Sequence, residues 1–96
     1  MKYYQLTNIA ESDISDIYEY GIRHFGLENA ANYMLGMHEQ FEMLVAHPEI
    51  GRSSNALLPG LKRLSYQSHV IFYLRQDECI LVIRVLRAEM DFERHI

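Results

Sequence analysis

The sequence predicts an α+β fold with the element order β-α-α-β-β-β, in which a helix hairpin packs on one face of a small, mostly antiparallel sheet. Two observations lead to this prediction. In the first half of the chain apolar residues recur every three or four positions, whereas after Gly60 bulky apolar runs and alternation with polar residues take over. The 96 residues are expected to form one domain, residues 1–96, because a chain of this length has no room for a second core.

A first helix is predicted to follow a short strand at Tyr3–Leu6. Thr7 can cap this helix, because its hydroxyl can accept a hydrogen bond from an open amide of the first turn. The helix presents one apolar stripe, formed by Ile14, Ile17, Tyr18, Gly21, Ile22 and Phe25. Gly26 can adopt the left-handed conformation in which helices often end, so the helix is expected to stop there.

A second helix is predicted over residues 28–47. Its apolar stripe consists of Ala30, Tyr33, Met34, Met37, Phe41, Leu44 and Val45. Pro48 ends it, because proline cannot continue the hydrogen-bond ladder. The connection at Gly26 is so short that the two helices must fold back on each other. Residues 49–60 contain many turn-forming residues and are expected to form a loop.

Three strands are predicted over residues 61–66, 68–75 and Cys79–Arg87. The second is rich in β-branched and aromatic residues and is expected to be the middle strand. In the third, strict alternation places four residues on one face: Ile80, Val82, Arg84 and Leu86. The tail, residues 88–96, is mostly polar. Because the helices cover only one face of the sheet, the other is expected to be solvated or covered by another chain.

The charge is distributed unevenly along the chain. The net charge is −4, with two basic against eight acidic residues in 1–50 and seven against five in 51–96. The overall acidity disfavours non-specific nucleic-acid binding, whereas the basic excess near the sheet permits an anionic partner.

No apolar run approaches the roughly 20 residues of a membrane span, and no signal peptide is recognisable, so a cytoplasmic location is expected. The single cysteine, Cys79, is predicted to be a small buried residue.

A series of short motifs runs through nearly the whole chain. The helical half contains Ala10, Asp13, Ile14, Ile17, Tyr18-Glu19-Tyr20, Phe25-Gly26, Phe41, Leu44, Pro48 and Gly51-Arg52. The strand half contains Pro59-Gly60-Leu61-Lys62, Ser68-His69-Val70-Ile71-Phe72-Tyr73, Arg84-Val85-Leu86-Arg87, Met90-Asp91 and Arg94-His95. In this order the motifs resemble the ParE branch of the RelE/ParE toxin superfamily of bacterial toxin–antitoxin operons.

The resemblance implies the toxin of a type II toxin–antitoxin system, neutralised by a ParD-type antitoxin that folds along its surface. It also implies inhibition of DNA gyrase by binding, without a catalytic site, cofactor or metal. Two alternatives stay open. One is a RelE-like ribosome-dependent endoribonuclease that cuts messenger RNA. The other is a non-toxic module that serves as an antitoxin-bound scaffold or operon co-repressor.

A ribonuclease of this fold would need a base for the 2′-hydroxyl, an acid for the leaving oxygen and cations for the phosphate. His69 opens the middle strand and is expected to be a hydrogen-bonded structural residue. Tyr73 is expected to pack in or beside the core with its hydroxyl paired. The RelE branch is typically basic near its end, whereas this tail carries Glu89, Asp91 and Glu93. The helical histidines lack metal-ligand spacing, so no zinc site is expected: His24, His38 and His47.

Two sets of contact residues are predicted. The target-binding set is Arg63, Arg84, Arg87 and His95. Arg87 is the strongest member, since the last strand ends there. Arg84 lies on an apolar strand face and must be paired or reach solvent, so Asp91 or an antitoxin carboxylate could pair with it instead.

The antitoxin-binding set is Tyr18, Tyr33, Met37, Phe41 and Arg75. The aromatic and Met residues of the helical stripes are core residues first, but the same residue types line grooves that bind amphipathic partner helices. An open sheet edge could also accept a strand from the antitoxin.

Overall fold

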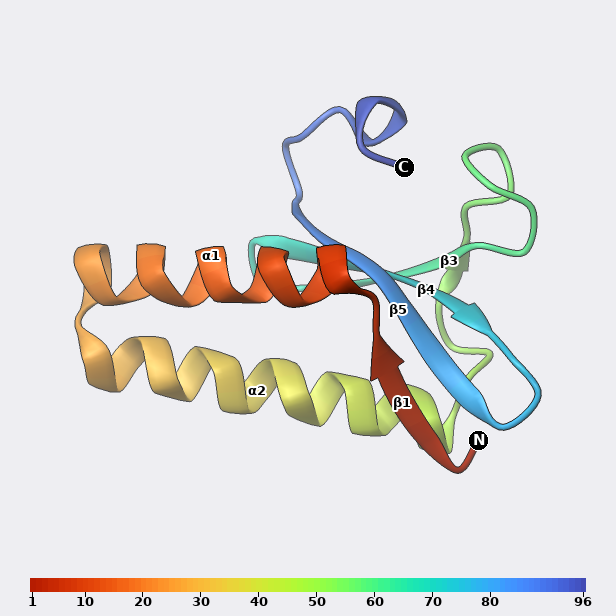
Figure 1. Cartoon of the computed structure of the whole chain (residues 1–96), viewed down its shortest axis with the longest axis horizontal. Coiled ribbons are helices and arrows are strands. Elements are labelled where there is room, and N and C mark those ends of the chain that lie inside the picture. Colours follow the sequence, from red (N-terminus) through yellow and green to blue (C-terminus); the bar gives the residue numbers. More distant parts are fainter.

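The computed structural model describes all 96 residues and contains two long helices packed against a five-stranded sheet (Figure 1). The elements are β1 (Tyr3–Leu6), α1 (Asn8–Phe25), α2 (Leu27–Ala46), β2 (Arg52–Ser53), β3 (Lys62–Tyr66), β4 (His69–Arg75), β5 (Cys79–Arg87) and the 3₁₀ turn η1 (Phe92–Arg94). The predicted fold class and element order are confirmed. The two-residue strand β2 lies in the predicted loop, and η1 lies in the tail. Neither helix is apolar enough to cross a bilayer.

The strands form one sheet in the order β1-β5-β4-β3-β2. β1 runs parallel to β5, and every other neighbouring pair is antiparallel. β4 is the middle strand, as predicted, and its inner residues are almost completely buried.

Hydrogen bonds fix the helix hairpin at both ends. The Thr7 hydroxyl accepts from the backbone N–H of Ala10 (3.0 Å) and donates to the carbonyl of Ile83 (2.8 Å), which ties the start of α1 to β5. Gly26 ends α1 as predicted, with φ +86°, a value that favours glycine, but its ψ of 160° differs from the predicted left-handed helical conformation. Its N–H donates to the carbonyl of Ile22. The closed end of the hairpin extends beyond the sheet (Figure 1).

The main core lies between the helices and the sheet. Met37, Phe41 and Leu44 pack there against β4 and β5. Tyr73 is fully buried in this core; its hydroxyl donates to the carbonyl of Pro48 (2.9 Å) and accepts from the N–H of Gly51 (3.0 Å). A Cβ at Gly51 would overlap this hydroxyl, so the chain requires glycine there. The predictions of a paired Tyr73 hydroxyl and a buried Cys79 are confirmed.

The opposite face of the sheet is covered by this chain itself, which corrects the expectation of solvent or another chain. A second core forms there from Leu61, Val70, Phe72 and Leu86. Leu57 from the loop and Met90, Phe92 and Ile96 from the tail pack against it. The Phe92 ring meets Phe72 edge to face, with ring centroids 4.9 Å apart. The three large apolar residues of the mostly polar tail therefore all pack on this face of the sheet.

A β-bulge in β5 corrects the predicted alternation. Phe72 is paired with Arg84 but Tyr73 with Val82, so Ile83 is an extra residue with no partner on β4. Val82 and Val85 therefore both face the helices and join the main core. Arg84 and Leu86 face the other side of the sheet, away from Val82. The prediction from the sequence rests on strict alternation of side chains along the strand, and such a pattern cannot indicate a bulge.

Candidate functional site

A groove with a volume of about 820 Å³ lies where the two helices meet the end of β5 and the tail. We call it the α1–β5 groove. Its lining includes Asp13, Asp16, Ile17, Tyr20 and Phe25 from α1, Asn29, Tyr33 and Met34 from α2, His69 from β4, Arg84, Val85 and Arg87 from β5, and Glu89, Met90 and His95 from the tail. Elements from both halves of the chain thus form one concave surface.

One wall of the groove is held by an ion pair between Asp13 and Arg84. The Arg84 Nε and Nη2 atoms donate to the two carboxylate oxygens of Asp13 at 2.8 and 2.9 Å, a bidentate arrangement. Both side chains are mostly buried, with 14% of Asp13 and 18% of Arg84 exposed. The hydrogen bonding that Arg84 donates to the Asp13 carboxylate is the main reason why the pKa of Arg84 is raised above its ordinary value.

Asp13 and Arg84 also bind the backbone around them. Asp13 Oδ2 accepts from the N–H of Val85 (3.0 Å), and Arg84 Nη1 donates to the carbonyl of His95 (2.9 Å). α1, the free edge of β5 and the tail are therefore joined through two side chains. The suggested pairing of Arg84 with Asp91 is wrong, since Asp91 lies instead 3.5 Å from Arg94.

Tyr33 and His69 line the groove and belong to a hydrogen-bonded group that also includes Tyr66. The Tyr33 hydroxyl lies 2.7 Å from Nδ1 of His69, and the Tyr66 hydroxyl donates to the carbonyl of Tyr33 (3.1 Å). Burial is the main reason why the pKa of His69 is lowered; Glu89 opposes this effect and Arg87 adds to it. His69 is therefore mostly neutral near pH 7 and makes the structural contact predicted for it.

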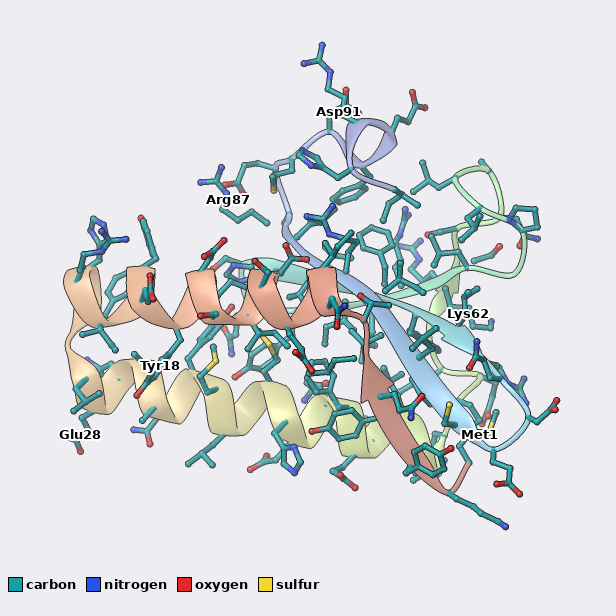
Figure 2. All side chains as sticks on the ribbon, in the orientation of Figure 1. Met1, Tyr18, Glu28, Lys62, Arg87 and Asp91 are labelled. Atoms are coloured by element: carbon teal, nitrogen blue, oxygen red, sulfur yellow. The ribbon has the colours of Figure 1, made fainter.

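Three of the four predicted target-binding residues line the α1–β5 groove. Arg87 is exposed at the end of β5, as predicted, with its Nε 3.5 Å from Glu89 Oε1. In Figure 2 it lies beside α1, below the tail that carries Asp91. His95 also lines the groove, whereas Arg84 is occupied by Asp13. Arg63 lies elsewhere, on β3 opposite Phe72.

The structure divides the predicted antitoxin-binding residues among different places. Met37 and Phe41 are only 1% and 3% exposed, so the expectation that these stripe residues belong first to the core is confirmed. In this conformation a partner cannot reach them, which corrects their place in the antitoxin-binding set. Tyr33 lies in the α1–β5 groove. Arg75 is exposed at the C-terminal end of β4, whereas His69 lies at the N-terminal end of the same strand.

Tyr18 lies between the two helices, as Figure 2 shows. It lines a second groove of about 720 Å³, which we call the outer groove, with Leu6, Glu11, Ile14, Ser15, Ala31, Met34 and Leu35. Leu35 is 62% exposed. An exposed leucine in a mostly apolar groove is typical of a surface that a partner covers.

Sequence reasoning missed two important groove residues, Asp13 and Tyr20. In the sequence Asp13 is one of the motif residues and has no evident partner, although a lone arginine on an apolar strand does require a carboxylate somewhere. Which carboxylate is close enough depends on how α1 crosses β5. No group of three or more His, Cys, Asp or Glu side chains converges in a way that could hold a metal ion.

Comparison with known proteins identifies the family. Residues 4–92 match the family described as "ParE toxin of type II toxin-antitoxin system, parDE". The chain belongs to the ParE toxin family. It is 35% identical to "Toxin ParE1" of Caulobacter vibrioides over 96 residues, covering all of this chain and 99% of that protein. It is 31% identical to "Toxin ParE1" of Mycobacterium tuberculosis over 94 residues, or 97% of this chain and 96% of that one.

The fold of this ParE-type chain also matches a solved structure. That structure, titled "Chromosomal ParDE TA system from P. aeruginosa", superposes with a TM-score of 0.79 at 26% identity. The match covers 93% of this chain and 97% of the other. The resemblance drawn from the motifs is thereby confirmed over nearly the full length.

We predict that Arg84→Gln lowers the free energy of unfolding by about 3 kcal/mol, because it leaves the mostly buried Asp13 carboxylate without its cation. The matched variant Arg87→Gln breaks an exposed ion pair and should cost less than about 1 kcal/mol. Urea unfolding followed by circular dichroism measures both. Equal losses in the two variants would contradict the role given to Asp13 and Arg84.

We predict a pH dependence of stability that originates at His69. The pKa of His69 is lower in the folded than in the unfolded state, so below about pH 6.5 the unfolded chain binds this proton more readily. The free energy of unfolding should therefore fall as the pH decreases from about 6.5. In His69→Gln this part of the loss should disappear. Urea unfolding of both proteins between pH 7.5 and 5 measures the difference, and parallel curves would rule out His69.

Proposed function

We propose that this chain is the toxin of a ParDE pair, that a ParD-type antitoxin neutralises it, and that it inhibits DNA gyrase by binding rather than by catalysing a reaction. The family and the ParDE title of the structural neighbour support the antitoxin partner. A gyrase inhibitor would act in the cytoplasm, where we expect the protein.

One observation supports binding rather than RNA cleavage: the Arg84 side chain is already paired with Asp13. A ribonuclease needs an unpaired cation near the scissile phosphate, but this guanidinium is neutralised by Asp13. His69 and Tyr73 are occupied as well, so the candidates that a ribonuclease could still use are Arg63, Arg87 and His95. The hydroxyl of Tyr73 is buried with both hydrogen bonds made, and His69 is engaged by Tyr33.

Arg87 is the cation that the α1–β5 groove leaves available. It is 61% exposed, and its only ion-pair partner is the equally exposed Glu89 at 3.5 Å. The exposed side chains of Tyr20 and Phe25 continue the same groove along α1. An arginine beside exposed aromatic side chains is typical of the residues that dominate protein–protein binding energies. We therefore assign gyrase binding to this groove, with Arg87 as its main contact.

We predict that the wild-type protein inhibits supercoiling by purified gyrase and that Arg87→Ala requires about tenfold more protein for half-inhibition. Such a loss is usual for an interface residue that contributes more than 1 kcal/mol. The control is Arg94→Ala. Arg94 is 83% exposed, pairs only with Asp91 and does not line the groove.

Full inhibition by Arg87→Ala would contradict the assigned contact but not the target. If induced wild-type protein stopped translation and left supercoiling intact, a RelE-like ribonuclease would replace the gyrase proposal. If neither process changed, the chain would be a non-toxic module.

The outer groove is the surface that we assign to the antitoxin, because it is apolar and exposes Leu35. We predict that Leu35→Glu weakens antitoxin binding at least tenfold in calorimetry, since it places a charge in an apolar contact. Met43→Glu is the matched control: Met43 is 41% exposed on the same helix but does not line the groove. Similar losses in both variants would show that the antitoxin binds elsewhere.

A further inference from the structure

Arg52 and Arg63 are direct neighbours on adjacent strands. Arg52 on β2 is paired with Arg63 on β3, and Arg63 is paired in turn with Phe72 on β4. Paired residues of antiparallel strands point to the same face, so both arginines lie on the face that carries the second core with Phe72. Arg52 is exposed and Arg63 is half-buried.

Neither arginine has a counter-ion within the chain. Lys2, Arg84, Arg87 and Arg94 each have a carboxylate oxygen within 3.5 Å, whereas Arg52 and Arg63 have none. Arg23, Lys62 and Arg75 also lack one, but Arg52 and Arg63 are the two arginines that are paired directly with each other in the sheet. Among the arginine side chains, only that of Arg84 donates hydrogen bonds to other residues of the chain, so those of Arg52 and Arg63 donate none. Like charges directly opposite on two strands destabilise a sheet, and burying part of an unpaired guanidinium adds to the cost.

We propose that Arg52 and Arg63 form a two-arginine clamp that binds a side-chain carboxylate of an acidic protein segment. Cβ atoms of directly opposed residues lie roughly 5 Å apart, so both guanidinium groups can reach one carboxylate. Each planar guanidinium can donate two parallel hydrogen bonds to such an oxyanion. The bound carboxylate removes the repulsion that the free chain contains.

The surroundings of the clamp favour a protein over a nucleic acid. Nucleic-acid binding depends on many phosphate contacts, but the next arginine in this row, Arg84, is already neutralised by Asp13. The chain has a net charge of −4. Exposed apolar side chains lie close along the sequence, Ile50 at 41% and Leu58 at 38%, and can contact apolar residues that flank an acidic one.

The clamp is separate from the α1–β5 groove and from the outer groove, since neither arginine lines them. The inference therefore does not depend on the proposed function. Arg63, which the sequence placed among the target-binding residues, is assigned here to a different contact.

The test is a titration of the full-length protein followed by NMR of the arginine Nε–Hε signals. The probe is a capped peptide in which Glu alternates with Leu and Ser, and its control is the same peptide with Gln in place of Glu. The Arg52 and Arg63 signals should shift and saturate with the Glu peptide and stay unchanged with the Gln peptide. Arg52→Gln, Arg63→Gln and the double variant should each weaken binding about tenfold, because both groups hold one carboxylate.

Arg23→Gln is the matched control, since Arg23 is an exposed arginine on α1. It should change the affinity less than twofold. The proposal is overturned if the Gln peptide gives the same shifts, if Arg23→Gln weakens binding equally, or if millimolar Glu peptide shifts neither signal. It is also overturned if a DNA duplex or a single-stranded RNA of equal charge binds these arginines more tightly than the peptide.

A second measurement does not depend on the peptide. Arg63→Glu replaces the repulsion with an ion pair to Arg52, so the melting temperature should rise by about 2–4 °C while peptide binding is lost. A lower melting temperature would show that the two positive charges are not in conflict and would overturn the proposal.

Discussion

The contact between Asp13 and Arg84 determines how the rest of the molecule is arranged. One carboxylate accepts from two guanidinium nitrogens and from the backbone of β5, and the guanidinium also holds the tail through the carbonyl of His95. β1 is paired with β5 only as far as Val82, so the edge of β5 beyond that point has no neighbouring strand. The Thr7 hydroxyl and the Asp13 carboxylate bind the backbone groups there, and both come from the first turns of α1.

The β-bulge at Ile83 makes this arrangement possible. By adding one residue to β5 it returns Val85 to the main core while Arg84 faces the opposite side near the sheet edge. There the guanidinium meets α1 on one side and the tail on the other. The tail in turn places Phe92 on Phe72 and closes the second core. Two cores on the two faces of one sheet therefore depend on a single irregular residue.

The proposed function depends on which polar side chains are occupied within the chain and which are accessible. Three polar side chains that could serve a ribonuclease are used internally: Arg84 by Asp13, His69 by Tyr33 and Tyr73 by the backbone at Pro48 and Gly51. The groups left accessible are an exposed arginine at the end of β5, an apolar groove between the helices and a pair of arginines on the far edge of the sheet. Each suits recognition of another protein, and they lie on different surfaces.

The sequence alone determined the elements whose cause is local. The helical stripes, the Thr7 cap, the turn at Gly26 and the buried middle strand follow from side-chain period and backbone preference, which act over a few residues. Motif order was enough to indicate the family. The tertiary structure decided what depends on residues far apart in the chain: the choice of Asp13 over Asp91 as partner of Arg84, and the cover that the tail gives the second face. An ion pair across 71 positions has no local signal, because it forms only after the helices have docked on the sheet.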